Sequence, residues 1–142
     1  MSTADLDVVR RAYSLYNAGE AERAARECFH EDVVLVRRPL GESEEYEGLD
    51  GLRRAHAEAR SEFANYRMEP ERFFAMEDRV VVAVRVSGSD PKTGIEALTA
   101  AAHVVDVRDG RVARWEVFLD LDEALAAAEW DAERGEVHWA TG

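Results

Sequence analysis

The most constraining feature of this 142-residue sequence is the stretch from Thr99 to Asp120, TAAAHVVDVRDGRVARWEVFLD. Polar and apolar residues alternate on both sides of Asp109-Gly110, and such alternation is typical of β-strands. Asp and Gly accept the positive φ angles that a two-residue hairpin turn requires. The stretch therefore predicts a long β-hairpin, with His103 on one strand and Trp115 on the other, over one cavity.

The rest of the chain changes from helical to strand periodicity after Tyr66. Helices followed by a run of antiparallel strands indicate an α+β fold. We expect a curved antiparallel sheet packed on N-terminal helices, with its helices on one face and a short C-terminal helix capped by Asp120. Residues 1–130 are expected to form one domain and 131–142 a tail. The expected helices are 2–18, 20–28, 50–63 (capped by Asp50) and 120–130, the expected strands are 33–37, 67–75, 79–87, 95–107 and 111–119, and residues 39–48 are expected to be irregular.

Composition limits the kinds of partner. Asp and Glu number 30 against 18 Lys and Arg, giving a net charge of −12. Nucleic acids and anionic membranes attract clustered positive charge, so we expect neither as a partner. Cys28 is the only cysteine, which excludes an intramolecular disulfide and favours a reducing compartment. The start, MSTADLDVV, lacks a signal-peptide pattern and no apolar run reaches transmembrane length, so we expect a cytoplasmic protein.

Three segments occur in a recognisable order: VVRRAYSLYNAGEAERAARECFHEDVVL, a Y-x-G-x-x-G-L pattern at Tyr46–Leu52, and DGRVARWEVFLDLDEAL. Together they resemble the SnoaL-like, polyketide cyclase-like branch of the nuclear transport factor 2-like superfamily. The resemblance implies a cone, in which a bent sheet wraps around helices and leaves a pocket at its open end, commonly in a homodimer through the outer sheet face. Members include ketosteroid isomerases, limonene epoxide hydrolases, polyketide cyclases and non-enzymatic binding domains, so the fold leaves function open.

The resemblance does not supply a known catalytic set. The tyrosine that polarises substrate in ketosteroid isomerases falls at Ala12 here, and their oxyanion-hole aspartate falls at His103. Their general-base aspartate lies just before a proline, where this chain has Arg37-Arg38-Pro39. The inward aspartate of limonene epoxide hydrolases falls at Val117. We therefore expect neither of those mechanisms.

His103 is the candidate catalytic residue, because small alanines beside it leave room and the resemblance puts it in the cavity. The alternative is a half-buried histidine bonded to a neighbour. Arg37 either points inward, where it would favour a carboxylate, phenolate or enolate, or lies in solvent at the end of its strand. We expect no metal site and no cofactor. The predicted pocket-lining residues are Tyr16, Arg37, Tyr46, Phe63, His103, Trp115 and Val117.

These residues favour a pocket protein that binds a small hydrophobic or aromatic molecule, or one carrying a carbonyl group, in the cone. Two alternatives stay open, so whether the protein is an enzyme is not decided by the sequence. One is a cofactor-free lyase, isomerase or cyclase with His103 as the acid/base. The other is a non-enzymatic interaction module, a homodimer whose outer sheet face is formed by Val81, Ala83, Arg85, Glu116 and Phe118.

Overall fold

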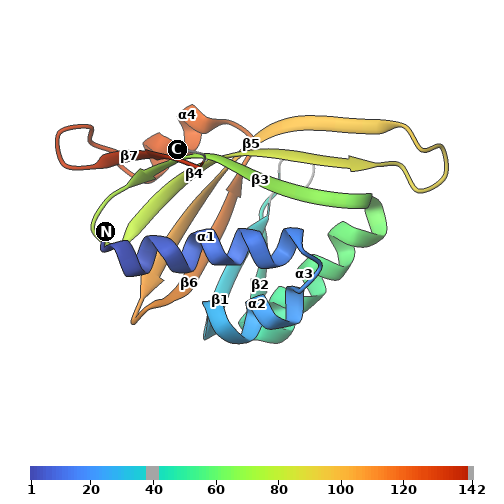
Figure 1. Ribbon diagram of the computed structural model, residues 1–142, viewed down its shortest axis with the longest axis horizontal. Coiled ribbons are helices and arrows are strands. Elements are labelled where there is room, and N and C mark those ends of the chain that lie inside the picture. The colour runs from blue at the N-terminus through green and yellow to red at the C-terminus, as the bar shows by residue number, and fades with distance from the viewer. Residues whose placement is uncertain (38–41, 141–142) are drawn as a thin grey trace.

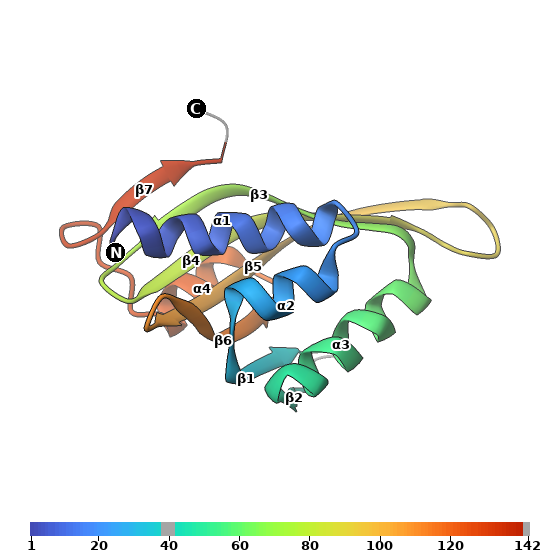
Figure 2. The same cartoon turned by 60° about the horizontal axis from the view of Figure 1, so that its bottom comes forward.

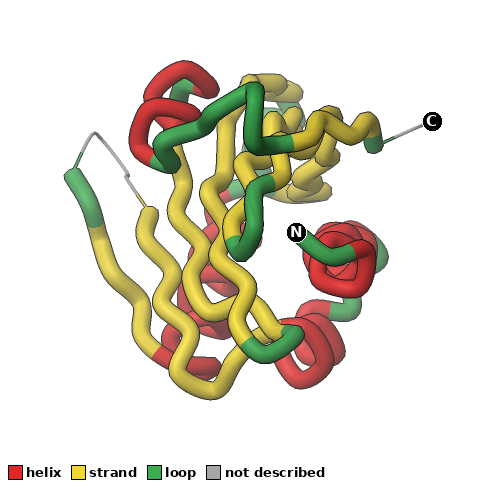
Figure 3. The backbone as a smooth tube through the Cα atoms, turned by 90° about the vertical axis from the view of Figure 1, so that its left-hand side faces the viewer, coloured by secondary structure: helices red, strands yellow, loops and turns green. Residues whose placement is uncertain are grey.

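The structure is a computed structural model that describes residues 1–37 and 42–140. Its centre is one seven-stranded sheet with the strand order β2-β1-β6-β5-β4-β3-β7. The sheet bends around three helices on its concave side, and a fourth helix lies on its outer side (Figures 1 and 3). The predicted α+β class is confirmed. The helices are α1 (Thr3–Asn17), α2 (Ala21–Cys28), α3 (Gly48–Glu62) and α4 (Leu121–Ala127), and the strands are β1 (Phe29–Arg37), β2 (Glu44–Glu47), β3 (Ala64–Ala75), β4 (Arg79–Ser89), β5 (Glu96–Arg108), β6 (Arg111–Phe118) and β7 (Glu136–Trp139).

The predicted hairpin is the pair β5–β6, and its turn is Asp109-Gly110 as expected. The φ angles of these two residues are 54° and 74°, which is the left-handed backbone that the turn type demands. The register sets His103 opposite Val117. Directly opposite residues of an antiparallel pair lie on the same face, so these two side chains are neighbours on the concave side.

Several boundaries differ from expectation for local reasons. The chain passes from α2 into β1 without a loop, and β1 then runs parallel to β6, whereas the other strand pairs among the described residues are antiparallel. Residues 44–47, expected to be irregular, pair with β1 as strand β2. α3 begins two residues before Asp50, so this side chain lies in the first turn and pairs with Arg53 instead of capping the helix. Residues 136–139, in the predicted tail, pair with β3 as strand β7.

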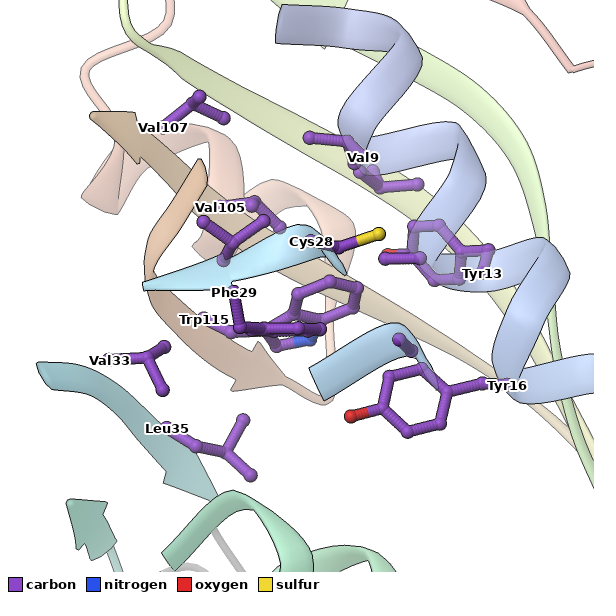
Figure 4. Packing of buried hydrophobic residues seen from close by; sticks show 14 of the residues in the cluster. Val9, Tyr13, Tyr16, Cys28, Phe29, Val33, Leu35, Val105, Val107 and Trp115 are labelled. Carbon is purple, nitrogen blue, oxygen red and sulfur yellow. The ribbon is translucent and has the colours of Figure 1, made fainter. Parts of the chain in front are cut away.

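The two sheet faces form separate apolar clusters. The concave cluster packs against α1, α2 and α3, and Figure 4 shows Val9, Tyr13 and Trp115 within it. The outer cluster packs against α4 through Ala124 and Ala128. The expectation that every helix lies on one face is therefore wrong for α4. None of the described helices is long and apolar enough to cross a membrane.

The position of α4 also changes the surface that is free for a partner. Val81, Ala83 and Phe118, which the sequence suggested as part of a dimer surface, are at most 8% exposed. They belong to the cluster that α4 covers, so these three side chains are not available to a second copy.

Candidate functional site

His103 lies on the concave face of the sheet, in contact with the first helix, and is only 2% exposed. Its Nδ1 atom and the Tyr13 hydroxyl oxygen are 2.7 Å apart and share a hydrogen bond. The Trp115 ring lies against both partners, with centroid distances of 5.1 Å to the imidazole and 5.0 Å to the phenol. The sequence predicted free space beside His103, because its neighbours on β5 are alanines. In the structure the Tyr13 side chain fills that space.

Burial keeps both members of this pair neutral. It lowers the pKa of the His103 imidazole to about 3, because the charged form is poorly solvated in apolar surroundings. It also raises the pKa of the Tyr13 hydroxyl well above its usual value. A neutral phenol and a neutral imidazole hold two hydrogens, of which one joins them and one is left for a further acceptor. The pair is thus suited to hydrogen-bond donation, and the imidazole is a weak proton acceptor near neutral pH.

A second aromatic pair lies between the helices and β1. The Tyr16 ring on α1 is 4.9 Å from the His56 ring on α3 and 6.0 Å from the ring of Phe29. In Figure 4 the Tyr16 hydroxyl points away from α1 toward β1. Burial raises the pKa of Tyr16 and lowers the pKa of His56. Within the described part of the chain, no hydrogen bond joins either of these polar groups to another residue.

A charged network lies where β1 meets α3. The Arg37 guanidinium is 3.6 Å from a Glu58 carboxylate oxygen. The Tyr46 hydroxyl donates to Glu58 at 2.6 Å, and this bond to a carboxylate is the main reason that the pKa of Tyr46 is raised to about 12. The Arg54 guanidinium lies 4.8 Å from the centre of the Tyr46 ring. These contacts hold Arg37 and Tyr46 on the side of α3 that faces the sheet.

Tyr66 on β3 interacts electrostatically both with Arg37 of this network and with Tyr13 of the buried pair. Burial raises the pKa of Tyr66, and the positive charge of nearby Arg37 opposes that rise. The electrostatic influence of Tyr66 also contributes, after burial, to the raised pKa of Tyr13. Its hydroxyl has no hydrogen-bond partner among the residues that the structure describes.

Two surface hollows lie elsewhere. One of about 380 Å³ is bordered by Asp32, Arg79 and Asp106, and in it the Arg79 guanidinium is already paired with Asp106 at 2.6 Å. The other, of about 760 Å³, lies between the β3–β4 turn and the segment after α4. No predicted pocket residue lines either hollow. In residues 1–37 and 42–140, no three His, Cys, Asp or Glu side chains converge as metal ligands would.

A family model described as the SnoaL-like domain matches residues 9–115 of the 142. The chain belongs to the SnoaL-like domain family. No curated protein matches its sequence.

Solved structures agree with this SnoaL-like assignment. TerC, co-crystallised with polyporic acid, is 22% identical with a TM-score of 0.71, over 90% of this chain and 98% of its own. A Jannaschia sp. CCS1 protein proposed to be a SnoaL-like polyketide cyclase is 19% identical with a TM-score of 0.73, over 88% and 91%. A Catenulispora acidiphila protein with a ketosteroid isomerase-like fold, in complex with trimethylamine, is 13% identical with a TM-score of 0.70, over 89% and 95%. At these identities the likeness shows the fold alone.

The SnoaL-like cone brings the predicted hairpin residues together. Trp115 and Val117 flank His103 on the concave face, and Tyr16 joins the same apolar cluster from α1. His103 is far more buried than a solvent-filled cavity would leave it, because Tyr13 and Trp115 pack against its ring.

The other predicted residues lie around α3, on β1, on β2 and at the C-terminal end of the helix. Arg37, with 23% of its side chain exposed, and Tyr46 meet at Glu58. Phe63 is 37% exposed just after α3, with its ring 6.3 Å from the ring of Tyr66. Arg38 and Pro39, which the comparison with ketosteroid isomerases used, lie outside the described residues.

Sequence reasoning missed Tyr13, since the resemblance pointed to Ala12. The spacing of Val9, Tyr13 and Tyr16 places them on one helix face, which indicates that Tyr13 is buried but does not identify its partner on the sheet. Tyr66 was missed because the expected strand began one residue later, whereas β3 starts at Ala64.

Proposed function

We propose that this SnoaL-like protein binds a small apolar or aromatic molecule carrying a carbonyl group, at the open end of its cone. The observation that carries the proposal is a concave surface that the helices cover only in part. Met68, Val86 and Val117 pack against the concave cluster but are only half-buried. We refer to the surface formed by these three residues as the mouth of the cone. Apolar walls with a few polar groups are the usual composition of a ligand pocket.

The polar groups at this mouth suit an electron-rich oxygen. The Tyr66 hydroxyl has no partner among the described residues and lies near the Arg37 guanidinium. A hydroxyl donor beside a cation favours a carbonyl, phenolate or enolate oxygen. Two proteins of this fold, TerC with polyporic acid and the Catenulispora protein with trimethylamine, hold small molecules, which supports a small-molecule role.

If the protein is an enzyme, the geometry favours hydrogen-bond donation by the Tyr13–His103 pair over acid/base catalysis by His103. As a cofactor-free lyase, isomerase or cyclase, the protein would use the neutral Tyr13–His103 pair to donate a hydrogen bond to a developing oxyanion. General-base work by His103 is disfavoured by its pKa of about 3. A reducing, cytoplasmic setting is part of the proposal as well, since Cys28 is a buried free thiol.

The binding site is tested by narrowing the mouth. A panel of hydrophobic ketones and polyketide-like aromatics is first screened by thermal shift, and the best ligand is titrated by calorimetry. Val86→Phe fills the mouth and is expected to weaken binding at least about tenfold, which corresponds to about 1.4 kcal/mol. Val137→Phe makes the same change on β7, where the side chain is 47% exposed, and should leave affinity unchanged. A panel that stabilises nothing, or equal affinities for both variants, contradicts the proposal.

The polar contact is tested by Tyr66→Phe. Removing one hydroxyl that bonds to a ligand oxygen should lower the affinity for ketones about fivefold, the effect of a hydrogen bond of about 1 kcal/mol. The affinity for the matching hydrocarbon should stay as in the wild type. Equal loss for ketone and hydrocarbon would mean that Tyr66 shapes the wall without contacting the carbonyl.

A further inference from the structure

The β4–β5 hairpin extends beyond the rest of the sheet as an arm, seen in both views (Figures 1 and 2). β6 ends at Phe118, which pairs with Ala102 of β5. From Glu96 to Ala100, β5 is paired with β4 on one side and with no described strand on the other. All five of these residues are exposed. The backbone groups on this side of β5 therefore form an open sheet edge.

This open edge lacks the protection that the two outer strands of the sheet carry. The outer strand β2 bears Glu44, Glu45 and Glu47, and the opposite outer strand β7 has only four residues. Natural sheet edges avoid pairing with other chains through charges, proline or short length. The segment Glu96–Ala100, EALTA, has one charge and no proline, and Leu98 at its centre is 67% exposed.

We propose that Glu96–Ala100 pairs in antiparallel fashion with the same segment of a second copy, joining the two sheets at a two-fold axis beside Leu98. An antiparallel edge is self-complementary, as a symmetric dimer interface must be. The two-fold axis passes through the middle of the five-residue segment, so Leu98 of one copy lies opposite Leu98 of the other. Position 96 then lies opposite position 100, and the side chains of each opposite pair share one face of the sheet. Glu96 then meets Ala100 of the partner subunit, and no like charges oppose each other.

The expected assembly is a weak dimer. Five residues of strand pairing bury much less surface than a stable dimer interface, which takes about 1,200–2,000 Å² in total. We therefore expect an equilibrium between monomer and dimer in the micromolar range. This surface is distinct from the outer sheet face, where α4 buries Val81, Ala83 and Phe118. Val86 is the β4 partner of Thr99 in this segment, but its side chain lies on the sheet face opposite to that of Leu98, which pairs with Ser87. The Leu98 variants therefore leave Val86 and Tyr66 unchanged, and ligand binding and dimerisation are tested by separate substitutions.

Crosslinking tests the two-fold position. Leu98→Cys places two thiols opposite each other, at a Cα separation of about 4.5–5.5 Å that a disulfide spans. The native Cys28 is fully buried and does not compete. Under mild oxidation at micromolar concentration, Leu98→Cys should give a covalent dimer on a denaturing gel. Val137→Cys, 47% exposed on β7, should stay monomeric. Equal crosslinking of both variants would overturn the proposal.

Sedimentation of a charged variant gives the second test. Leu98→Lys sets two positive charges opposite each other and should shift the dimerisation constant at least about tenfold toward monomer. Its melting temperature, measured at a dilution where the wild type is monomeric, should change little because Leu98 is exposed. A wild type that is monomeric throughout the micromolar range overturns the proposal, and so does a dimer that Leu98→Lys leaves intact.

Discussion

Replacing His103 with alanine is expected to lower the free energy of unfolding by about 3 kcal/mol, the usual cost of a cavity plus a lost buried hydrogen bond. The imidazole is 2% exposed, and its removal leaves the Tyr13 hydroxyl without its partner and Trp115 without a neighbour. Urea unfolding of wild type and variant at one pH measures the difference. The prediction follows from the packing of the ring, independently of any catalytic role.

A double-mutant cycle separates the hydrogen bond from the cavity. Tyr13→Phe keeps the ring and removes only the hydroxyl, so it should cost about 1–2 kcal/mol. Combined with His103→Ala it should add less than its single effect, because the bond is already lost. The opposite result is a His103→Ala variant that unfolds like the wild type while losing ligand or turnover. That outcome would place His103 in a solvated, catalytic cavity instead of a packed pair.

The hairpin could be predicted because its determinants are local. Asp109-Gly110 fixes the turn, but strict alternation from that turn would set Trp115 opposite Val104, on the other face from His103. A register shift between Asp106 and Val107 sets Trp115 opposite Val105 instead, on the face of His103, where their rings are 5.1 Å apart. The contents of the space between them could not be predicted in this way. Whether Tyr13 or Ala12 faces β5 depends on how α1 is rotated against the sheet, and that rotation is set by the whole concave cluster.

Arg37 shows the same limit for a charged residue. Sequence reasoning left two orientations open, since a terminal arginine on a strand is stable inside only with a partner. The partner is Glu58, twenty-one positions later on α3, which the Tyr46 hydroxyl also holds. Neither spacing nor composition connects these residues. The orientation of a charged site residue therefore depends on its ion-pair partner on another helix or strand, whereas the fold class follows from the periodicity of the sequence.

Acid should destabilise the protein more steeply than an equivalent chain without His103. Burial lowers the pKa of His103 from 6.5 to about 3, so between these values the unfolded state binds a proton that the folded state does not. Stability is therefore full above about pH 6.5 and falls as the pH drops, by up to about 1.4 kcal/mol per pH unit. Urea unfolding between about pH 7 and pH 5 covers this range while most carboxylates stay ionised.

His103→Asn removes the titrating group but keeps a polar side chain near Tyr13, so the variant should be less stable at neutral pH and lose most of the steep acid dependence. His56→Asn is the matched control. The pKa of His56 is also lowered, by burial and by Arg60, but its site is only partly buried, so a smaller part of the dependence should disappear. Equal pH dependence in wild type and His103→Asn would mean that the imidazole is reached by water and protonates in the folded state, as an open catalytic cavity requires.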